Sequence, residues 1–373
     1  MTDAAASGPP AEPSTDAWLP HLATRATGVA LAPPVQPVAL NDDEWARLHG
    51  QVTTGRITWT LLDAVLTGDL PASDEQAEQA ALSHRTAMGV AVRLEQDLRR
   101  TSGILRRAGI ETRVLKGPAV AHLDYQDPSQ RDFGDIDLLV HSADMTATVA
   151  ALEEAGFERV LPAVRPHLDR IFNKSVTVHS PGGWELDLHR ALFPGAFALV
   201  LSEPALWDAP EPFVVGDDAF LAMPRPMRIL QTAGHLVLGS TTPRLSTVRD
   251  LVVQLDRLDD PTPLEQAARD TSLTAVLQAA IEHLDGQQLM VPGDWGDWAA
   301  TVEPGERGRR LLAEHVGAHG NFNAQARSAL RLLPLHQRLS VLAALALPHR
   351  EHLAARGLTR RRHLAARLRR TNS

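Results

Sequence analysis

The sequence contains no cysteine and few aromatic residues. Aromatic side chains make up 4% of its 373 residues, and there is a single tyrosine. Without cysteine, disulfides, thiolate catalysis and cysteine-ligated zinc or iron–sulfur sites are excluded. Hydrophobic residues still make up 44% of the chain. This fraction is sufficient for a buried core, packed mainly by Ala and Leu in helices.

Long apolar runs are also missing. The longest candidate, residues 341–347, ends at Pro348 and is far shorter than the roughly 18 residues that a membrane span needs. The first residues lack both the basic start and the apolar core of a secretory signal. We therefore expect a soluble, cytoplasmic protein without a membrane span.

The chain has no excess of positive charge. Its formal net charge of -8 argues against non-specific nucleic-acid binding by the whole molecule. The exception is the basic stretch RGLTRRRHLAARLRR at residues 356–370. Nucleic acid is a possible partner only through this tail, for which a solvated basic helix is the commoner interpretation.

Hydrophobic periodicity and turn residues predict an α+β protein: a small mixed-sheet core between helical N-terminal and C-terminal regions. Asn41 followed by Glu44 is typical of a helix start, and a longer helix is expected from about residue 75 to 108. The predicted parts are a flexible leader (1–38), a helical N-terminal region (39–108), the α/β core (109–215) and a helical C-terminal domain with the basic tail (216–373).

Two aspartates stand two positions apart at the start of an apolar segment, residues 136–140, that we predict to be a strand. Successive side chains of a strand alternate between its faces, so Asp135 and Asp137 point to the same side. Two adjacent buried carboxylates repel each other unless a cation lies between them. Mg²⁺ takes oxygen ligands and binds through one or two carboxylates together with substrate phosphates.

A third carboxylate lies on a predicted hairpin, whose strands at 174–179 and 184–188 flank Ser-Pro-Gly-Gly. Asp187 shares its strand face with His189, for which a metal-binding or substrate-orienting role and a structural role are equally supported. Three acidic residues on adjacent strands predict a site for two Mg²⁺ ions. One ion would activate the attacking oxygen and the other would neutralise a triphosphate.

A glycine turn precedes these aspartates. Gly117 lies between a predicted strand at 112–115 and a short predicted helix, so the backbone can approach a ligand closely. The N–H groups at the start of that helix are a natural phosphate-binding site.

The order of these features also resembles a known family. The segment from about 85 to 255 is similar to the uncharacterised nucleotidyltransferases of bacterial genomes, a branch of the superfamily that includes DNA polymerase beta and the aminoglycoside nucleotidyltransferases. The matching residues are Leu115-Lys116-Gly117, Ala119 to His122, Tyr125, Asp127-Pro128, Arg131, Gly134 to Val140 and Asp187-Leu188-His189.

The resemblance implies roles for these residues. Asp135 and Asp137 would be metal ligands, Asp187 the third carboxylate, and Gly117 part of the nucleotide-phosphate turn. Lys116 and Arg131 would contact the triphosphate. The chain departs from the wider superfamily at Pro118, where Ser or Gly is frequent, and proline has no N–H to donate.

Together these patterns predict an enzyme: an Mg²⁺-dependent nucleotidyltransferase that transfers NMP from a nucleoside triphosphate such as ATP to an acceptor hydroxyl on a small molecule, a protein or RNA. Two alternatives remain open. One is an Asp-x-Asp glycosyltransferase that uses a sugar nucleotide, and the other is an inert binding module of the same fold, which Pro118 favours. We interpret His235, between apolar residues of a predicted helix, as a packing residue.

Overall fold

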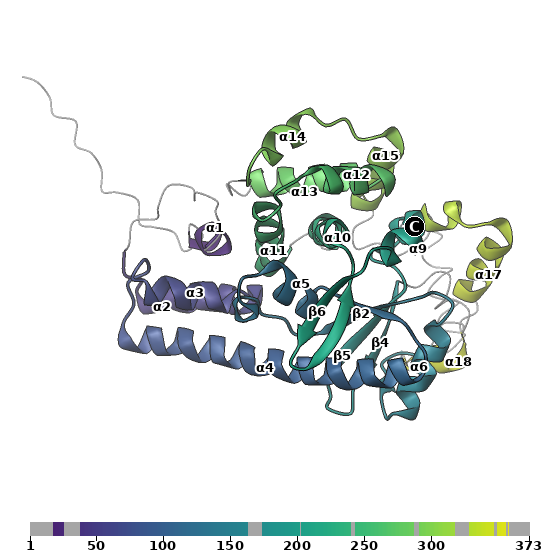
Figure 1. Cartoon of the computed structure of the whole chain (residues 1–373), viewed down its shortest axis with the longest axis horizontal. Coiled ribbons are helices and arrows are strands. Elements are labelled where there is room, and N and C mark those ends of the chain that lie inside the picture. Colours follow the sequence, from purple (N-terminus) through teal and green to yellow (C-terminus); the bar gives the residue numbers. More distant parts are fainter. Residues whose placement is uncertain are drawn as a thin grey trace, which may run out of the picture.

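The computed structural model describes residues 18–25, 38–162, 174–201, 203–239, 243–286, 291–317, 328–346, 349–355 and 357. A mixed sheet lies at the centre, a long helix runs along one side of it, and further helices gather on the other side (Figure 1). The expected α+β class is confirmed. In the described part of the chain, no helix is both long and apolar enough to cross a membrane.

Within the described residues the sheet has seven strands, in the order β3-β4-β5-β2-β1-β7-β6. Two neighbouring pairs are parallel, β2 with β5 and β1 with β7, and the other pairs are antiparallel. The strands are β1 (Thr112–Leu115), β2 (Ile136–Val140), β3 (Glu158–Arg159), β4 (Ser175–His179), β5 (Glu185–His189), β6 (Glu211–Val215) and β7 (Asp218–Ala222).

Successive side chains of the central strands point to opposite faces of the sheet, and each face packs against its own hydrophobic core. Ile136, Leu138 and Val140 of β2 share a cluster with residues of α4 (Asp74–Arg107) and α6 (Met145–Glu154). Leu139, with the opposite parity, belongs to a second cluster built largely from α10 (Arg225–Leu238) and its neighbours. Odd-numbered residues of β2 therefore face α10.

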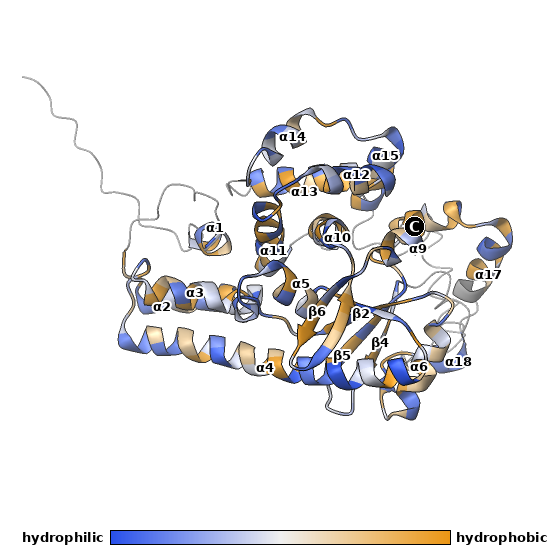
Figure 2. Cartoon of the chain, in the orientation of Figure 1, coloured by the Kyte–Doolittle hydropathy of each residue, from blue (hydrophilic) through white to orange (hydrophobic). Residues whose placement is uncertain are grey.

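The helices before the sheet match the expected starts. Asn41 and Glu44 form a capping box at α2 (Asp42–Gly55), and the long helix α4 begins with a second capping box at Ser73. Apolar and polar residues are mixed along α4 (Figure 2), and many of its buried residues recur three or four positions apart, so one side of the helix is buried. α3 (Thr58–Leu66) packs against α4.

A short helix, α1 (Trp18–Ala23), lies within the stretch that the sequence led us to expect as a flexible leader. Trp18 and Leu22 are buried in a cluster with residues of α2 and α3. The large apolar surface of one tryptophan is the physical reason that this segment packs.

The helices after the sheet occupy the region expected to be helical. They are α10, α11 (Leu245–Asp256), α12 (Thr262–Asp270), α13 (Thr274–Gly286), α14 (Trp295–Thr301), α15 (Glu306–Val316), α17 (Leu335–Ala346) and α18 (Arg350–Ala355). Three short helices, α5 (Gly117–Asp124), α8 (Phe197–Val200) and α9 (Glu203–Trp207), and a 3₁₀ turn, η2 (Pro128–Gln130), lie among the strands.

Strand β7 was not expected, because the sequence pattern after residue 215 predicts helices. Gly216, with φ +59°, forms the turn of a β6–β7 hairpin, and β7 joins the sheet beside β1. The alternating burial along β7 explains the strand: Phe220 and Ala222 are buried and Leu221 is exposed.

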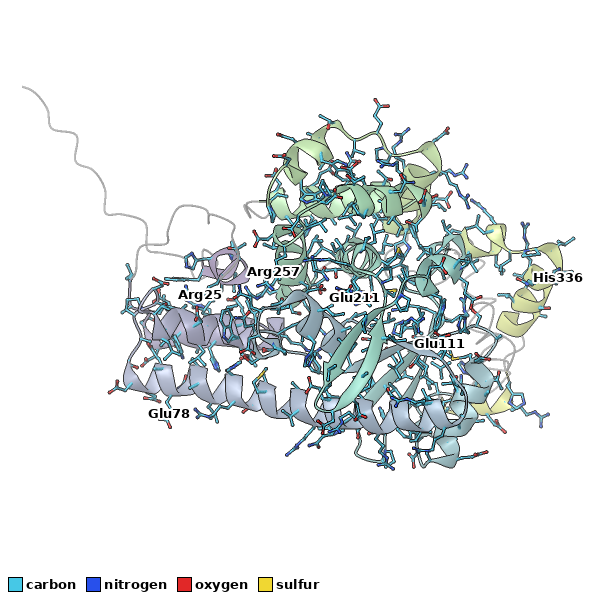
Figure 3. The ribbon with its side chains drawn as sticks, viewed as in Figure 1. Arg25, Glu78, Glu111, Glu211, Arg257 and His336 are labelled. Atoms are coloured by element: carbon cyan, nitrogen blue, oxygen red, sulfur yellow. The ribbon has the colours of Figure 1, made fainter. Side chains whose placement is uncertain are left out.

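A buried polar network connects the sheet to the C-terminal helices. The fully buried Asp124 accepts hydrogen bonds from Arg228 and Gln254. Arg228 also pairs with Glu211, and Arg257 donates to the Asp124 carbonyl; Glu211 and Arg257 are labelled in Figure 3.

Candidate active site

The parallel pairing of β2 and β5 brings two of the predicted carboxylates together. Asp137 is the register partner of Asp187. Single ligand atoms of Asp137, Asp187 and His189 all lie within 4.8 Å of one another. These side chains lie on the face of the sheet that is turned towards α10.

Asp137 is buried and held by two basic side chains. Lys116 Nζ donates to its Oδ1 at 2.9 Å, and His189 Nε2 lies 2.6 Å from the same oxygen. Burial alone would raise the pKa of Asp137, but Lys116 and His189 hold it well below the usual value. The carboxylate is therefore ionised throughout the neutral pH range.

Asp187 and Asp135 are more exposed. The Asp187 side chain is 23% exposed and accepts a hydrogen bond from Thr177 Oγ1 at 2.5 Å. The Asp135 side chain is 38% exposed, and its Oδ1 lies 3.5 Å from Arg56 Nη1. Asp135 does not belong to the three-residue cluster but lines the same cavity as Asp187.

The cavity has a volume of about 420 Å³ and lies between the sheet, α5, α10 and α11. Its lining is rich in charged and polar side chains. The lining residues are Arg56, Lys116, Gly117, Val120, Arg131, Asp132, Phe133, Asp135, Lys174, Asp187, Gln231, Thr232, His235, Gly239, Pro243, Arg244, Ser246, Thr247 and Asp250.

The glycine turn has an unusual backbone. Lys116 adopts φ 43° and ψ −136°, a conformation that side-chain-bearing residues rarely adopt. A Cβ on Gly117 would lie 3.4 Å from the Asp135 carbonyl, so the turn packs closely against the first aspartate. Pro118 occupies the first turn of α5, where a missing N–H breaks no intrahelical bond.

Arg131 supports this turn. Its guanidinium makes two hydrogen bonds to Asp250, of 2.8 and 2.6 Å, and Nη1 donates to the Gly117 carbonyl at 3.2 Å. The side chain is 9% exposed. The residue lines the cavity, yet two of its hydrogen bonds go to Asp250 and a third goes to the turn.

Most of the predicted site residues therefore meet around one cavity. Asp135, Asp187, Lys116, Gly117 and Arg131 line it. Asp137 and His189 are buried beside Lys116 and are not part of the lining. The basic tail lies outside the described residues, apart from Gly357.

Sequence reasoning missed Lys174, and it interpreted His235 as a packing residue. Both line the cavity. Burial, and then the charge of Lys116, lower the pKa of Lys174 to about 8, and burial lowers the pKa of His235 well below its ordinary value. Lys174 could have been singled out from the sequence by its rarity, because Lys116 and Lys174 are the only two lysines among the 37 Lys and Arg residues of the chain.

Arg56 was also missed. It lies in the N-terminal helical region, 79 positions before Asp135, and nothing in its local sequence marks it. Only the packing of α2 and α3 against the core brings it to the cavity.

Several solved structures match this chain, among them two of low similarity. The lincosamide antibiotic adenylyltransferase LnuA, with lincomycin bound, has 13% identity and a TM-score of 0.30, covering 43% of this chain and 97% of that one. An antigenic nucleotidyltransferase-like protein from Paracoccidioides brasiliensis has 14% identity and a TM-score of 0.30, covering 56% and 94%. The curated proteins contain no match.

The assignment rests on a family model that matches residues 41–285. This range includes the glycine turn, the three aspartates, both lysines and His235. The protein belongs to the family described as uncharacterised nucleotidyltransferase.

Proposed function

We propose that this protein transfers a nucleoside monophosphate from an NTP to an acceptor hydroxyl, with Mg²⁺ held by Asp135, Asp137 and Asp187. The observation that carries the proposal is the pairing of Asp137 with Asp187 beside a cavity that also contains Asp135 and the glycine turn. Family membership favours this chemistry over transfer from a sugar nucleotide.

The donor set fits a hard divalent cation. Asp135 and Asp187 present partly exposed carboxylates to the cavity, and Asp137 is ionised behind them. Carboxylate oxygens are the ligands that Mg²⁺ prefers. When bound, the cation would neutralise the phosphates of the nucleotide and lower the pKa of the attacking hydroxyl.

Other residues of the chain would bind the triphosphate or position the groups that bind it. Lys116 and Lys174 supply positive charge to a triphosphate, and the N–H groups at the start of α5, to which Pro118 contributes none, donate to phosphate oxygens. His189 orients Asp137 through its 2.6 Å contact. Arg131 fixes the turn that carries Lys116 and Gly117.

In the reaction, the acceptor oxygen attacks the α-phosphorus and a new O–P bond forms. The bond from the α-phosphorus to the oxygen that bridges to the β-phosphorus breaks, and pyrophosphate leaves with the electron pair. The hydroxyl proton passes to Asp187. This residue belongs to the cluster with Asp137 and His189, and it is the member of that cluster that lines the cavity. An RNA acceptor would require the basic stretch at 356–370.

The test uses NTPs labelled at the α-phosphate. The protein is incubated with each of the four NTPs, Mg²⁺, and small-molecule, protein and RNA acceptors. We expect label transfer that Asp135→Asn and Asp137→Asn each abolish while the fold, measured by circular dichroism, is retained. A folded wild-type protein that binds none of the NTPs would overturn the proposal.

One observation favours a second candidate, an inert binding module. Lys116 already balances the charge of Asp137 without a metal, and His189 Nε2 lies 2.6 Å from the same carboxylate oxygen. A module of this kind would keep its partner in the Asp135→Asn and Asp137→Asn variants, whereas an enzyme would lose transfer.

A further inference from the structure

Arg56 enters the cavity from the end of α2. It caps this helix in the left-handed conformation, with φ 58° and ψ 52°, and its N–H is bonded to the carbonyls of Thr53 and Val52. Glycine or asparagine is usual at such a position, because a Cβ makes the conformation unfavourable. An arginine at this position makes the backbone conformation less favourable than a glycine would, which indicates that its side chain has a function.

The turn that carries Arg56 is fixed to the site. The Thr58 N–H, two residues later, donates to Asp132 Oδ2 at 2.9 Å, and both groups are buried. Asp132 lies in the same loop as Asp135, so the position of the loop and the position of Arg56 are coupled. The N-terminal helices thereby contribute to the cavity wall.

Because Gly134 has no side chain, the guanidinium of Arg56 can occupy the space beside it. A Cβ at this position would lie 2.7 Å from Nη2 and 2.9 Å from Cζ of Arg56, and its three nearest atoms all belong to this side chain. Gly134 is not among the residues with positive φ, so its backbone does not require glycine. A side chain at 134 would therefore require the guanidinium of Arg56 to move.

The present partner of Arg56 holds it weakly. Its Nη1 lies 3.5 Å from Asp135 Oδ1, and the two side chains are 30% and 38% exposed. Lys116 and Arg131, by contrast, make short bonds to Asp137 and Asp250. A cation bound at Asp135 would repel the guanidinium unless an anion lay beside it.

We propose that Arg56 is a phosphate-binding residue of the active site and that Gly134 positions it. The inference rests on the proposed function, because the anion it commits to is the triphosphate of the bound NTP. The planar guanidinium can bind two phosphate oxygens through two parallel N–H donors, a fixed geometry that the ammonium group of a lysine does not provide. When the nucleotide enters, Arg56 exchanges Asp135 for phosphate oxygens.

The test measures dissociation constants by titration calorimetry. The probes are the NTP that the wild-type protein binds best and inorganic tripolyphosphate, each with Mg²⁺. Arg56→Gln should weaken both by roughly ten- to a hundredfold, the effect of losing a charged hydrogen bond. The dissociation constants of Arg56→Lys should lie between those of Arg56→Gln and the wild type. Arg47→Gln, an exposed arginine of the same helix that does not line the cavity, is the matched control and should bind as wild type.

Gly134→Ala supplies an independent arm. Its methyl group should displace the guanidinium and weaken both probes to a similar extent, and the double variant with Arg56→Gln should be no weaker than Arg56→Gln alone. If either residue had only a structural role, the losses of binding free energy in the two single variants would add in the double variant. Thermal unfolding of each variant shows whether the fold is retained.

Several outcomes would overturn the inference. If Arg56→Gln binds both probes within about threefold of wild type, Arg56 does not bind phosphate. If Arg56→Gln binds Mg²⁺ more tightly and NTP no more weakly, Arg56 is only a counter-charge to Asp135. A wild-type protein that binds no NTP would instead overturn the proposed function, and this inference with it.

Discussion

Replacing Lys174 by methionine should stabilise the protein at neutral pH. Lys174 lines the cavity, and burial lowers its pKa from 10.5 to about 8. Methionine has a similar length and keeps the apolar contacts of the side chain but carries no charge.

The magnitude follows from proton linkage. Below about pH 8 both states are protonated, and the folded state carries the full penalty of a buried ammonium group. A pKa difference from 10.5 to about 8 corresponds to about 3 kcal/mol. Between these pH values the unfolded chain binds a proton that the folded protein does not, so wild-type stability rises with pH and the penalty vanishes near 10.5.

The assay is urea denaturation of wild type and Lys174→Met between pH 7 and 10. We expect the variant to be more stable by about 3 kcal/mol at pH 7, and this advantage should shrink steadily above pH 8. The same variant should bind NTP more weakly, because a residue that destabilises the fold is retained for its charge. A variant that is not stabilised at pH 7, or whose advantage is independent of pH, would refute the reasoning.

Three further changes test a close packing contact, a buried ion pair and a helix cap, each by urea denaturation. Gly234→Ala should lower the free energy of unfolding by about 1–3 kcal/mol, because its Cβ would lie 2.1 Å from Phe193 Cε1; unchanged stability would mean that the ring moves freely. Arg228→Met should lower it by about 3–5 kcal/mol, because the buried Asp124 loses its ion pair, and Arg228→Lys should lose less. Asn41→Ala should lower it by about 1 kcal/mol through loss of the capping box, and an effect as large as that of Arg228→Met would contradict this account.

The acidic part of the site was predictable because it depends on local periodicity. Asp135 directly precedes β2 and Asp137 lies on it, and the hairpin signal placed Asp187 on another strand. The register that pairs Asp137 with Asp187 depends on the parallel contact between β2 and β5, which no turn in the sequence specifies.

The cationic part was less predictable, because it depends on packing between distant segments. Arg56 reaches the cavity only through the contact of the α2–α3 turn with the loop at 132–135. His235 has the apolar neighbours of a core residue, and only the position of α10 over the sheet places it at the cavity. The roles of the individual site residues and the division into domains remain predictions.

The central claim is that the neighbouring carboxylates of β2 and β5 hold a cation that binds the nucleotide. The most direct measurement is the affinity for NTP with and without Mg²⁺, in wild type and in Asp187→Asn. We expect Mg²⁺ to raise the wild-type affinity about tenfold or more and to have little effect on the variant. Equal affinities with and without Mg²⁺ in the wild-type protein, or an undiminished Mg²⁺ effect in Asp187→Asn, would contradict the claim.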